Sequence, residues 1–179
     1  MKKILITLIA LSLTSCATMM GDRTVNVTGE QIAQKLNEKL ALPISLLKVF
    51  DVNLSNSLVT FDKTTGRMIT TMDTKLSSQL FNQSLAGKLG ISGKLRFDAA
   101  TSTVVLDEPK VENFDVAGAG SKYNDLFNAF AKTVGGEMLN GLTLYTLKPE
   151  DLKFGGTSYS PKDMVVTDNG LQLTLTPQR

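Results

Sequence analysis

The sequence of 179 residues contains no histidine and only one cysteine. Without histidine, the Ser-His-Asp and Cys-His arrangements that activate a nucleophile are excluded. The zinc sites built from histidine or from several cysteines are excluded on the same grounds. A lone cysteine also has no partner for a disulfide within the chain. We therefore expect a protein that is not an enzyme and that holds no metal and no cofactor.

Long apolar runs are also missing. The apolar segment over residues 4–13 has about ten residues, whereas a membrane-spanning helix needs about twenty. Lys2 and Lys3 precede this segment and small residues follow it, as in a cleavable secretory signal peptide. The segment ends in Leu13-Thr14-Ser15-Cys16, which resembles the lipobox of bacterial lipoproteins. The alternative is an ordinary signal peptide with an incidental cysteine.

The lipobox resemblance implies a fate for Cys16. In such proteins the cysteine thiol receives a diacylglycerol group, the peptide is cleaved before the cysteine, and the new amine is acylated with a fatty acid such as palmitate. Several acyl chains anchor a protein far more firmly than one chain does. Ala17 follows the cysteine where Asp would favour the inner membrane. We therefore expect a lipid anchor in the outer membrane and a protein on its periplasmic face.

Cleavage changes the charge balance. The full sequence has 19 basic and 17 acidic side chains, and residues 1–15 contain Lys2 and Lys3 but no acid. The remaining 164 residues therefore carry 17 side chains of each sign, which predicts no basic face and no nucleic-acid binding. This length suits one domain. We assign residues 1–15 to the signal peptide, 16–27 to the lipidated cysteine and a tether, and 28–179 to a single α+β domain.

Two helices are expected. Thr28 and Gln31 have the spacing of a capping box, and the helical spacing of Ile32, Leu36 and Leu40 predicts a helix of about three turns before Pro43. Its apolar stripe is narrow, so we expect it on the outside of the domain. A broad apolar stripe over residues 121–142 predicts a long central helix. Gly135-Gly136 within it predicts a kink, which either leaves room for a ligand or allows close packing.

Between these helices the period of the apolar residues changes to two. Alternation is clearest over residues 88–98, and turn residues at 62–66 and 98–102 separate strands expected over 46–61, 67–76, 88–98 and 103–106. Later strands are expected over 152–159 and 164–176, and the second stretch is split by a turn at residues 167–170, whose Asn169-Gly170 is a hairpin signal. The expected fold class is α+β, with a strongly curved antiparallel sheet wrapped around a long helix and a short N-terminal helix.

Two further groups of residues are less specific. Ala117-Gly118-Ala119-Gly120 lacks the third glycine of a dinucleotide-binding loop, and we interpret it as a hinge. Four carboxylates lie close together in the sequence, which leaves open a glycosidase pair or a calcium site. We favour a solvated strand edge for them. They are Asp107, Glu108, Glu112 and Asp115.

Taken together, several features resemble the YceB-like family of Gram-negative envelope lipoproteins, a family of unknown function. They are the lipobox, the capped helix at residues 28–36 (TGEQIAQKL), the alternating strands, and Leu144-Tyr145-Thr146-Leu147 followed by a Lys-Pro segment. The family is similar in fold to the tubular lipid-binding proteins, in which a bent sheet wraps a long helix and leaves an apolar groove. The resemblance implies a lipid or other hydrophobic ligand, but it supplies no site residues.

Apolar residues on the expected sheet and long helix are the candidate walls of that groove. They are Leu89, Ile91, Leu95, Phe97, Phe127, Phe130, Val134 and Met138. Apolar stripes of this kind more often form plain core than ligand contacts. We expect a lipoprotein that binds or carries a lipid or another hydrophobic ligand there. The alternative is a structural or assembly lipoprotein without catalytic activity, which docks an envelope protein through a sheet edge.

Overall fold

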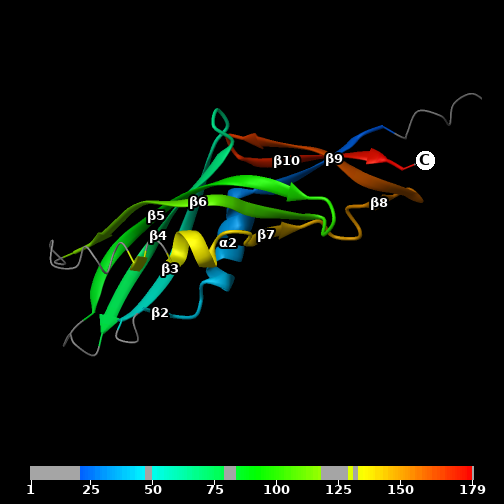
Figure 1. The fold of residues 1–179 in the computed structure, drawn as a ribbon. Coiled ribbons are helices and arrows are strands. Elements are labelled where there is room, and N and C mark those ends of the chain that lie inside the picture. The colour runs from blue at the N-terminus through cyan, green and yellow to red at the C-terminus, as the bar shows by residue number, and fades with distance from the viewer. Residues whose placement is uncertain (1–20, 47–49, 79–83, 118–128, 131–132, 179) are drawn as a thin grey trace, which may run out of the picture.

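The computed structural model describes residues 21–46, 50–78, 84–117, 129–130 and 133–178, which form two antiparallel sheets (Figure 1). The smaller sheet contains, in order, β1 (Arg23–Thr28), β10 (Gly170–Pro177), β9 (Thr157–Thr167) and β8 (Lys153–Phe154). The larger sheet contains, in order, β2 (Ile44–Leu46), β3 (Phe50–Asp62), β4 (Arg67–Ser78), β5 (Leu85–Asp98), β6 (Thr103–Val116) and β7 (Thr143–Thr146). β1 therefore includes the last residues of the stretch assigned to the tether.

The predicted hairpins are present. β3 pairs with β4 around the turn at 63–66, β5 pairs with β6 around the turn at 99–102, and β9 pairs with β10 with Thr167 opposite Gly170. Two expected strands are wrong. Residues 46–61 contain the end of β2 and most of β3, and residues 152–159 contain β8, the turn at Gly155-Gly156 and the start of β9. The alternation of apolar residues alone does not distinguish one long strand from two strands that pair with each other.

The predicted fold class is wrong. The protein is mostly β, and the described residues contain one short α-helix, α2 (Gly29–Lys39), and no long helix around which the larger sheet wraps. Within the stretch 121–142, the described part forms the π-helical turn η2 (Thr133–Met138), after which Gly141 adopts a left-handed conformation with φ of 76°. The Gly-Gly pair lies inside this wider turn, and the left-handed Gly141 follows its end, so the apolar spacing does not continue as an α-helix to residue 142.

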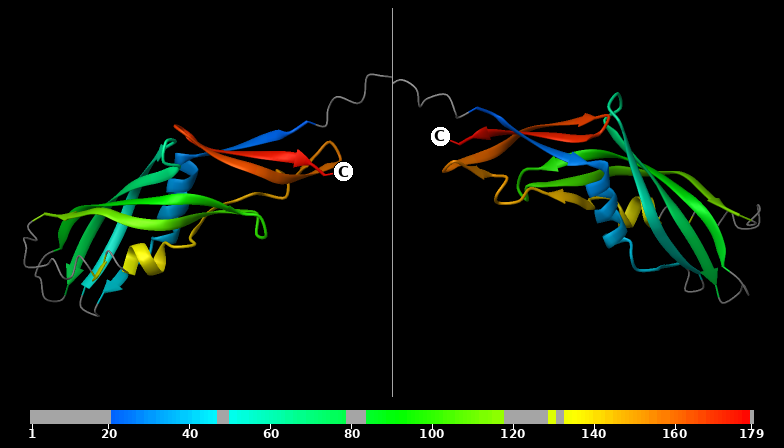
Figure 2. Two further views of the ribbon diagram at one scale, coloured as in Figure 1. Left: turned by 45° about the horizontal axis from the view of Figure 1, so that its top comes forward. Right: turned by 180° about the vertical axis from the view of Figure 1, so that it is seen from behind.

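As the narrow stripe predicts, α2 keeps its polar side at the surface, where Gln34, Glu38 and Lys39 are exposed. Ile32, Leu36 and Leu40 are buried, and α2 contacts both β3 and β7, so it lies inside the curl of the larger sheet (Figures 1 and 2). A narrow apolar stripe is enough for this position because only one side of the helix faces the sheet. The capping box is confirmed: the Thr28 N–H donates to Gln31 Oε1 at 2.9 Å, and the Gln31 N–H donates to Thr28 Oγ1 at 3.3 Å.

Bulges and glycines allow the larger sheet to curl. The β3–β4 register shifts between Ser55 and Leu58, where Asn56 has a φ of 52°. At this bulge the Ser57 N–H donates to Asn37 Oδ1 at 3.1 Å, which fixes α2 to the sheet. In β5, a Cβ atom on Gly87 would overlap the carbonyl oxygen of Asp115 in β6. Glycine therefore lets the two backbones approach where the curl is tight.

One buried cluster connects the two sheets and the helix. It includes Ile32 and Leu36 of α2, interior residues of the larger sheet, and three leucines of β10 in the smaller sheet. These leucines are Leu171, Leu173 and Leu175. Among the described helices, none is long and apolar enough to cross a membrane.

Candidate functional site

The concave face of β4 combines apolar and polar side chains. Met68, Met72 and Leu76 are buried on this face, and Thr70 and Thr74 alternate with them. Because successive side chains of a strand point to opposite faces, the two threonines face the same interior as the methionines. This face of β4 is the centre of the candidate site, since β4 lies between β3 and β5 in the middle of the larger sheet.

The hydroxyls of Thr70 and Thr74 have no hydrogen-bond partner, although these residues are only 2% and 3% exposed. Apolar residues surround them: Thr70 lies between Val59 and Ile91 in the sheet, and Leu54 pairs with Thr74. Leaving a buried hydroxyl without a partner costs about 1–3 kcal/mol. Buried polar groups in native proteins are normally satisfied, so two such hydroxyls on one face require an explanation.

The structure places most of the predicted groove residues around this face. Leu89, Ile91 and Leu95 of β5 are buried in the core cluster, and Phe97 packs against it. Leu89 pairs directly with Met72, and Ile91 pairs with Thr70. The alternation of β5 therefore identified the correct face of that strand.

The predicted residues of the expected helix have different positions. Phe130 and Val134 are buried in the same cluster, and Phe130 stacks on Phe114 with 4.6 Å between ring centroids. Met138 is 40% exposed and is not part of the wall, because the Leu139 N–H donates to Val134 O and this wider turn buries Leu139 instead. Phe127 and Cys16 lie outside the described residues.

Sequence reasoning missed Thr70 and Thr74. The alternation over 67–76 places both on the face that carries Met68 and Met72, and this is the signal that could have found them. Threonine is common on both faces of a strand, so its type does not reveal that the side chain is buried.

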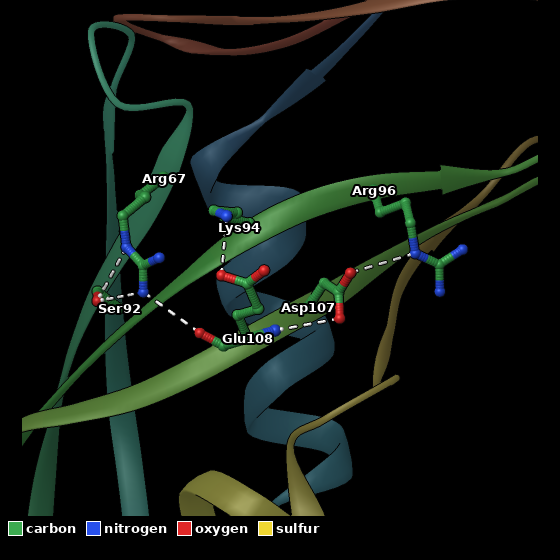
Figure 3. A network of polar contacts seen from close by, with 6 residues as sticks. All are labelled: Arg67, Ser92, Lys94, Arg96, Asp107 and Glu108. Carbon is green, nitrogen blue, oxygen red and sulfur yellow. Dashed lines mark hydrogen bonds and ion pairs between the residues drawn. The ribbon is translucent and has the colours of Figure 1, made fainter.

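Of the four carboxylates, Asp107 and Glu108 belong to a network of polar contacts on the sheet surface (Figure 3), and Glu112 and Asp115 are exposed. Lys94 Nζ lies 2.8 Å from Glu108 Oε2, and Arg96 Nε lies 3.4 Å from Asp107 Oδ2. The Arg67 guanidinium donates to Ser92 Oγ and, through Nη2, to the Glu108 carbonyl at 3.3 Å. No group of three or more metal-binding side chains occurs in the described part of the chain. The network joins β4, β5 and β6 where β6 bulges at Glu108.

A hollow lies between α2 and β7, away from the face of β4. It is a groove of about 450 Å³, with Leu144, Leu147 and Pro149 among its apolar residues. Its helix side carries polar residues, of which Lys35 and Glu38 form an ion pair of 3.0 Å. Next to the groove, the Tyr145 hydroxyl lies 3.5 Å from Asp151 Oδ2. Burial and this carboxylate raise the pKa of Tyr145 above its usual 10.0.

The edge of β7 faces this groove. The Leu147 N–H donates to Ser102 O at 2.9 Å, and Thr146 stands opposite Thr103 of β6. In an antiparallel pair, hydrogen-bonded positions alternate with positions whose backbone groups point away. The N–H and C=O of Thr146 therefore point away from β6, and they are available to another strand.

These features define a β-rich protein in which a curled sheet encloses a short helix and presents an apolar interior with two unpartnered hydroxyls. The chain belongs to the DUF1439 family of proteins of unknown function, whose model matches residues 27–169. No curated protein matches the sequence.

Proposed function

We propose that this protein is an outer-membrane lipoprotein, anchored through acylated Cys16 on the periplasmic side, that binds a lipid or another hydrophobic ligand against the concave face of its larger sheet. The finer resemblance to YceB-like envelope lipoproteins is part of this proposal. The observation that carries the proposal is the pair of buried hydroxyls of Thr70 and Thr74, which have no partner in an apolar interior.

The chemistry of this face suits a ligand with an apolar body and one or more oxygen atoms, such as an acyl chain with a carboxyl or ester group. Its oxygen would accept a hydrogen bond from a threonine hydroxyl and remove the cost of the unpartnered group. Burial of the ligand's own apolar surface against Met72 and Leu89 would supply most of the affinity, at about 25 cal/mol per Å² removed from water. Methionine side chains are flexible, so Met68 and Met72 can repack around a chain. No covalent step is proposed.

The test uses a Cys16→Ala chain secreted without acylation and purified without detergent. Native mass spectrometry should show a bound lipid, and the doubly substituted Thr70→Val and Thr74→Val chain should lose most of it. The matched control is Thr71→Val, the same change on the opposite face of β4. Protein that is repeatedly empty and takes up no fluorescent fatty acid would overturn the proposed binding.

The anchor has a separate test. Cells that express the full chain should incorporate labelled palmitate into it, and Cys16→Ala should abolish the label and release the protein from the membrane fraction. Label that persists in the Cys16→Ala chain would contradict acylation at this residue.

A second candidate function is the docking of an envelope protein, and the free edge of β7 favours it. An extended segment of a partner could pair with Thr146 while it lies in the groove beside α2. A photo-crosslinking residue at Gln34, which lines the groove, should trap a defined partner in intact cells. The same residue at Lys39, which does not line the groove, is the control. Equal crosslinking at both positions would count against docking in the groove.

A further inference from the structure

The β8–β9 hairpin places an exposed aromatic ring at its turn. Phe154 pairs with Thr157, and Gly155 and Gly156 form a two-residue connection with φ of 57° and 80°. Positive φ at both positions is typical of a tight hairpin turn that glycine adopts without strain. Phe154 is the last residue before this turn and is 56% exposed, although it is large and apolar.

This turn lies beside the point where the chain continues toward Cys16. The Arg23 guanidinium carbon lies 3.7 Å from the centre of the Phe154 ring, and Arg23 is the first residue of β1. Figures 1 and 2 show β8 and the start of β1 at the same end of the molecule. The turn between α2 and β2, at residues 40–43, lies at the other end (Figure 1).

The length of chain between Arg23 and Cys16 limits how far this end can be from the anchor. The two residues are seven positions apart, and an extended chain spans at most about 3.6 Å per residue. Arg23 is therefore within about 25 Å of an acylated Cys16. If Cys16 is held at the membrane surface, the end of the molecule that carries Arg23 and Phe154 is the end nearer to the membrane.

The charges at this end are compatible with a phospholipid surface. Lys153 precedes Phe154 in the chain, and the Arg23 guanidinium lies over the Phe154 ring. The nearby Asp22 carboxylate is neutralised by Lys162, whose Nζ lies 2.9 Å from Asp22 Oδ2. Glu150 and Asp151 line a hollow beside the ring. Asp151 accepts the Lys148 N–H at 3.0 Å, so its carboxylate is engaged within the protein. A ring flanked by two cations matches the boundary between anionic headgroups and acyl chains.

We propose that Arg23, Lys153 and Phe154 form a membrane-facing tip that lies on the anionic phospholipid leaflet holding the anchor. The Phe154 ring enters the headgroup region, and the two cations contact phosphate groups. This inference rests on the proposed acylation of Cys16. It assigns an orientation to the protein: the smaller sheet is next to the membrane, and the curled sheet is away from it.

The absence of tryptophan from the sequence provides a direct test. The full acylated chain with Phe154→Trp is reconstituted in vesicles of phosphatidylethanolamine and phosphatidylglycerol whose acyl chains carry bromine, which quenches tryptophan emission on contact. We expect the emission to shift to shorter wavelength and to fall relative to vesicles without bromine. The matched control is Leu42→Trp, because Leu42 is 80% exposed and lies in the turn at the opposite end. Its emission should be unaffected.

The outcomes separate the tip from the anchor. A chain that does not float with the vesicles overturns the anchor, and the tip with it. A chain that floats, but whose Phe154→Trp emission is not quenched more than that of Leu42→Trp, overturns the tip alone. Equal quenching of both variants shows that the protein lies on the membrane without a preferred end, which also overturns the proposal.

Discussion

At the scale of single residues, the unpartnered hydroxyl of Thr70 has a cost that can be measured. Thr70→Val keeps the shape of the side chain and removes the hydroxyl, so the free energy of unfolding of ligand-free protein should rise by about 1 kcal/mol. The control Thr71→Val, on the convex face, should change it by less than about 0.5 kcal/mol. Urea unfolding of delipidated protein measures both. A loss of stability in Thr70→Val would show that the hydroxyl has a partner within the protein.

A second residue-scale prediction concerns Gly87. An added Cβ would overlap backbone atoms of Asp115 and Val116, which cannot move away as a flexible side chain can. Gly87→Ala should therefore lower the free energy of unfolding by about 1–3 kcal/mol, the usual cost of overpacking. Gly21→Ala is the control, because nothing lies within 4 Å of its added Cβ. The midpoint of denaturant unfolding reports the change, and equal midpoints for the two variants would contradict the close approach.

At the scale of elements, the β3–β4 hairpin should make stability depend on pH through Asp62. The Thr65 hydroxyl donates to Asp62 Oδ2 at 2.7 Å, and the Thr64 N–H donates to Oδ1 at 2.9 Å. These bonds hold the pKa of Asp62 below its usual 3.8. A carboxyl with a lowered pKa in the folded state adds stability above its unfolded pKa, and this stability is lost as the pH falls through the folded pKa.

The hydroxyl of Thr65 is the largest cause of this shift, so Thr65→Val should raise the pKa of Asp62 toward 3.8. Titration of the Asp62 carboxyl by NMR measures the pKa directly. The variant should also lose less stability than the original protein when the pH falls from about 5 to about 2. An unchanged pKa of Asp62 would show that the Thr65 hydroxyl does not stabilise the ionised carboxylate.

Local patterns predicted the elements whose partners are close in sequence. The alternation over 88–98 correctly identified most of β5, and the turn residues at 62–66 correctly placed the turn between β3 and β4. The spacing of Thr28 and Gln31 correctly identified a helix start. The stretch 121–142 shows the limit of this reasoning. Its helical spacing is a local property, but residues 133–138 form a π-helical turn beside β6 rather than a continuation of an α-helix. Curling of the sheet also depends on bulges whose positive-φ residues, Asn56 and Glu108, are not glycine.

The candidate site was predictable to the same extent. Alternation placed Leu89 and Ile91 on the concave face, and both are buried there. In an α-helix, Met138 would lie four residues after Val134 on the same buried face. In the structure the Leu139 N–H donates to Val134 O, five residues earlier, and this wider turn buries Leu139 instead of Met138. The groove between α2 and β7 could not be predicted, because these elements are more than a hundred residues apart and come together only when the sheet curls.

At the scale of the whole molecule, the shared core predicts that the two sheets unfold together. Leu173 of β10 is fully buried in a cluster that also contains Met72 of β4 and Leu89 of β5. Leu173→Ala should therefore lower the free energy of unfolding by about 2–5 kcal/mol, the usual cost of such a change in a core. Val165→Ala on the neighbouring strand is the control, because Val165 is largely exposed.

Hydrogen exchange locates the effect within the molecule. If both sheets belong to one cooperative unit, the slowest amides of β4 and β5 should exchange faster in Leu173→Ala by the same factor as those of β10. If only β1, β9 and β10 respond, the smaller sheet opens on its own and the shared cluster does not couple the two sheets. A coupled response would mean that the tip formed by Arg23, Lys153 and Phe154 and the concave face of β4 keep a fixed position relative to each other. A ligand held against Thr70 and Thr74 would then stabilise both sheets, because binding to the folded state alone raises the free energy of unfolding.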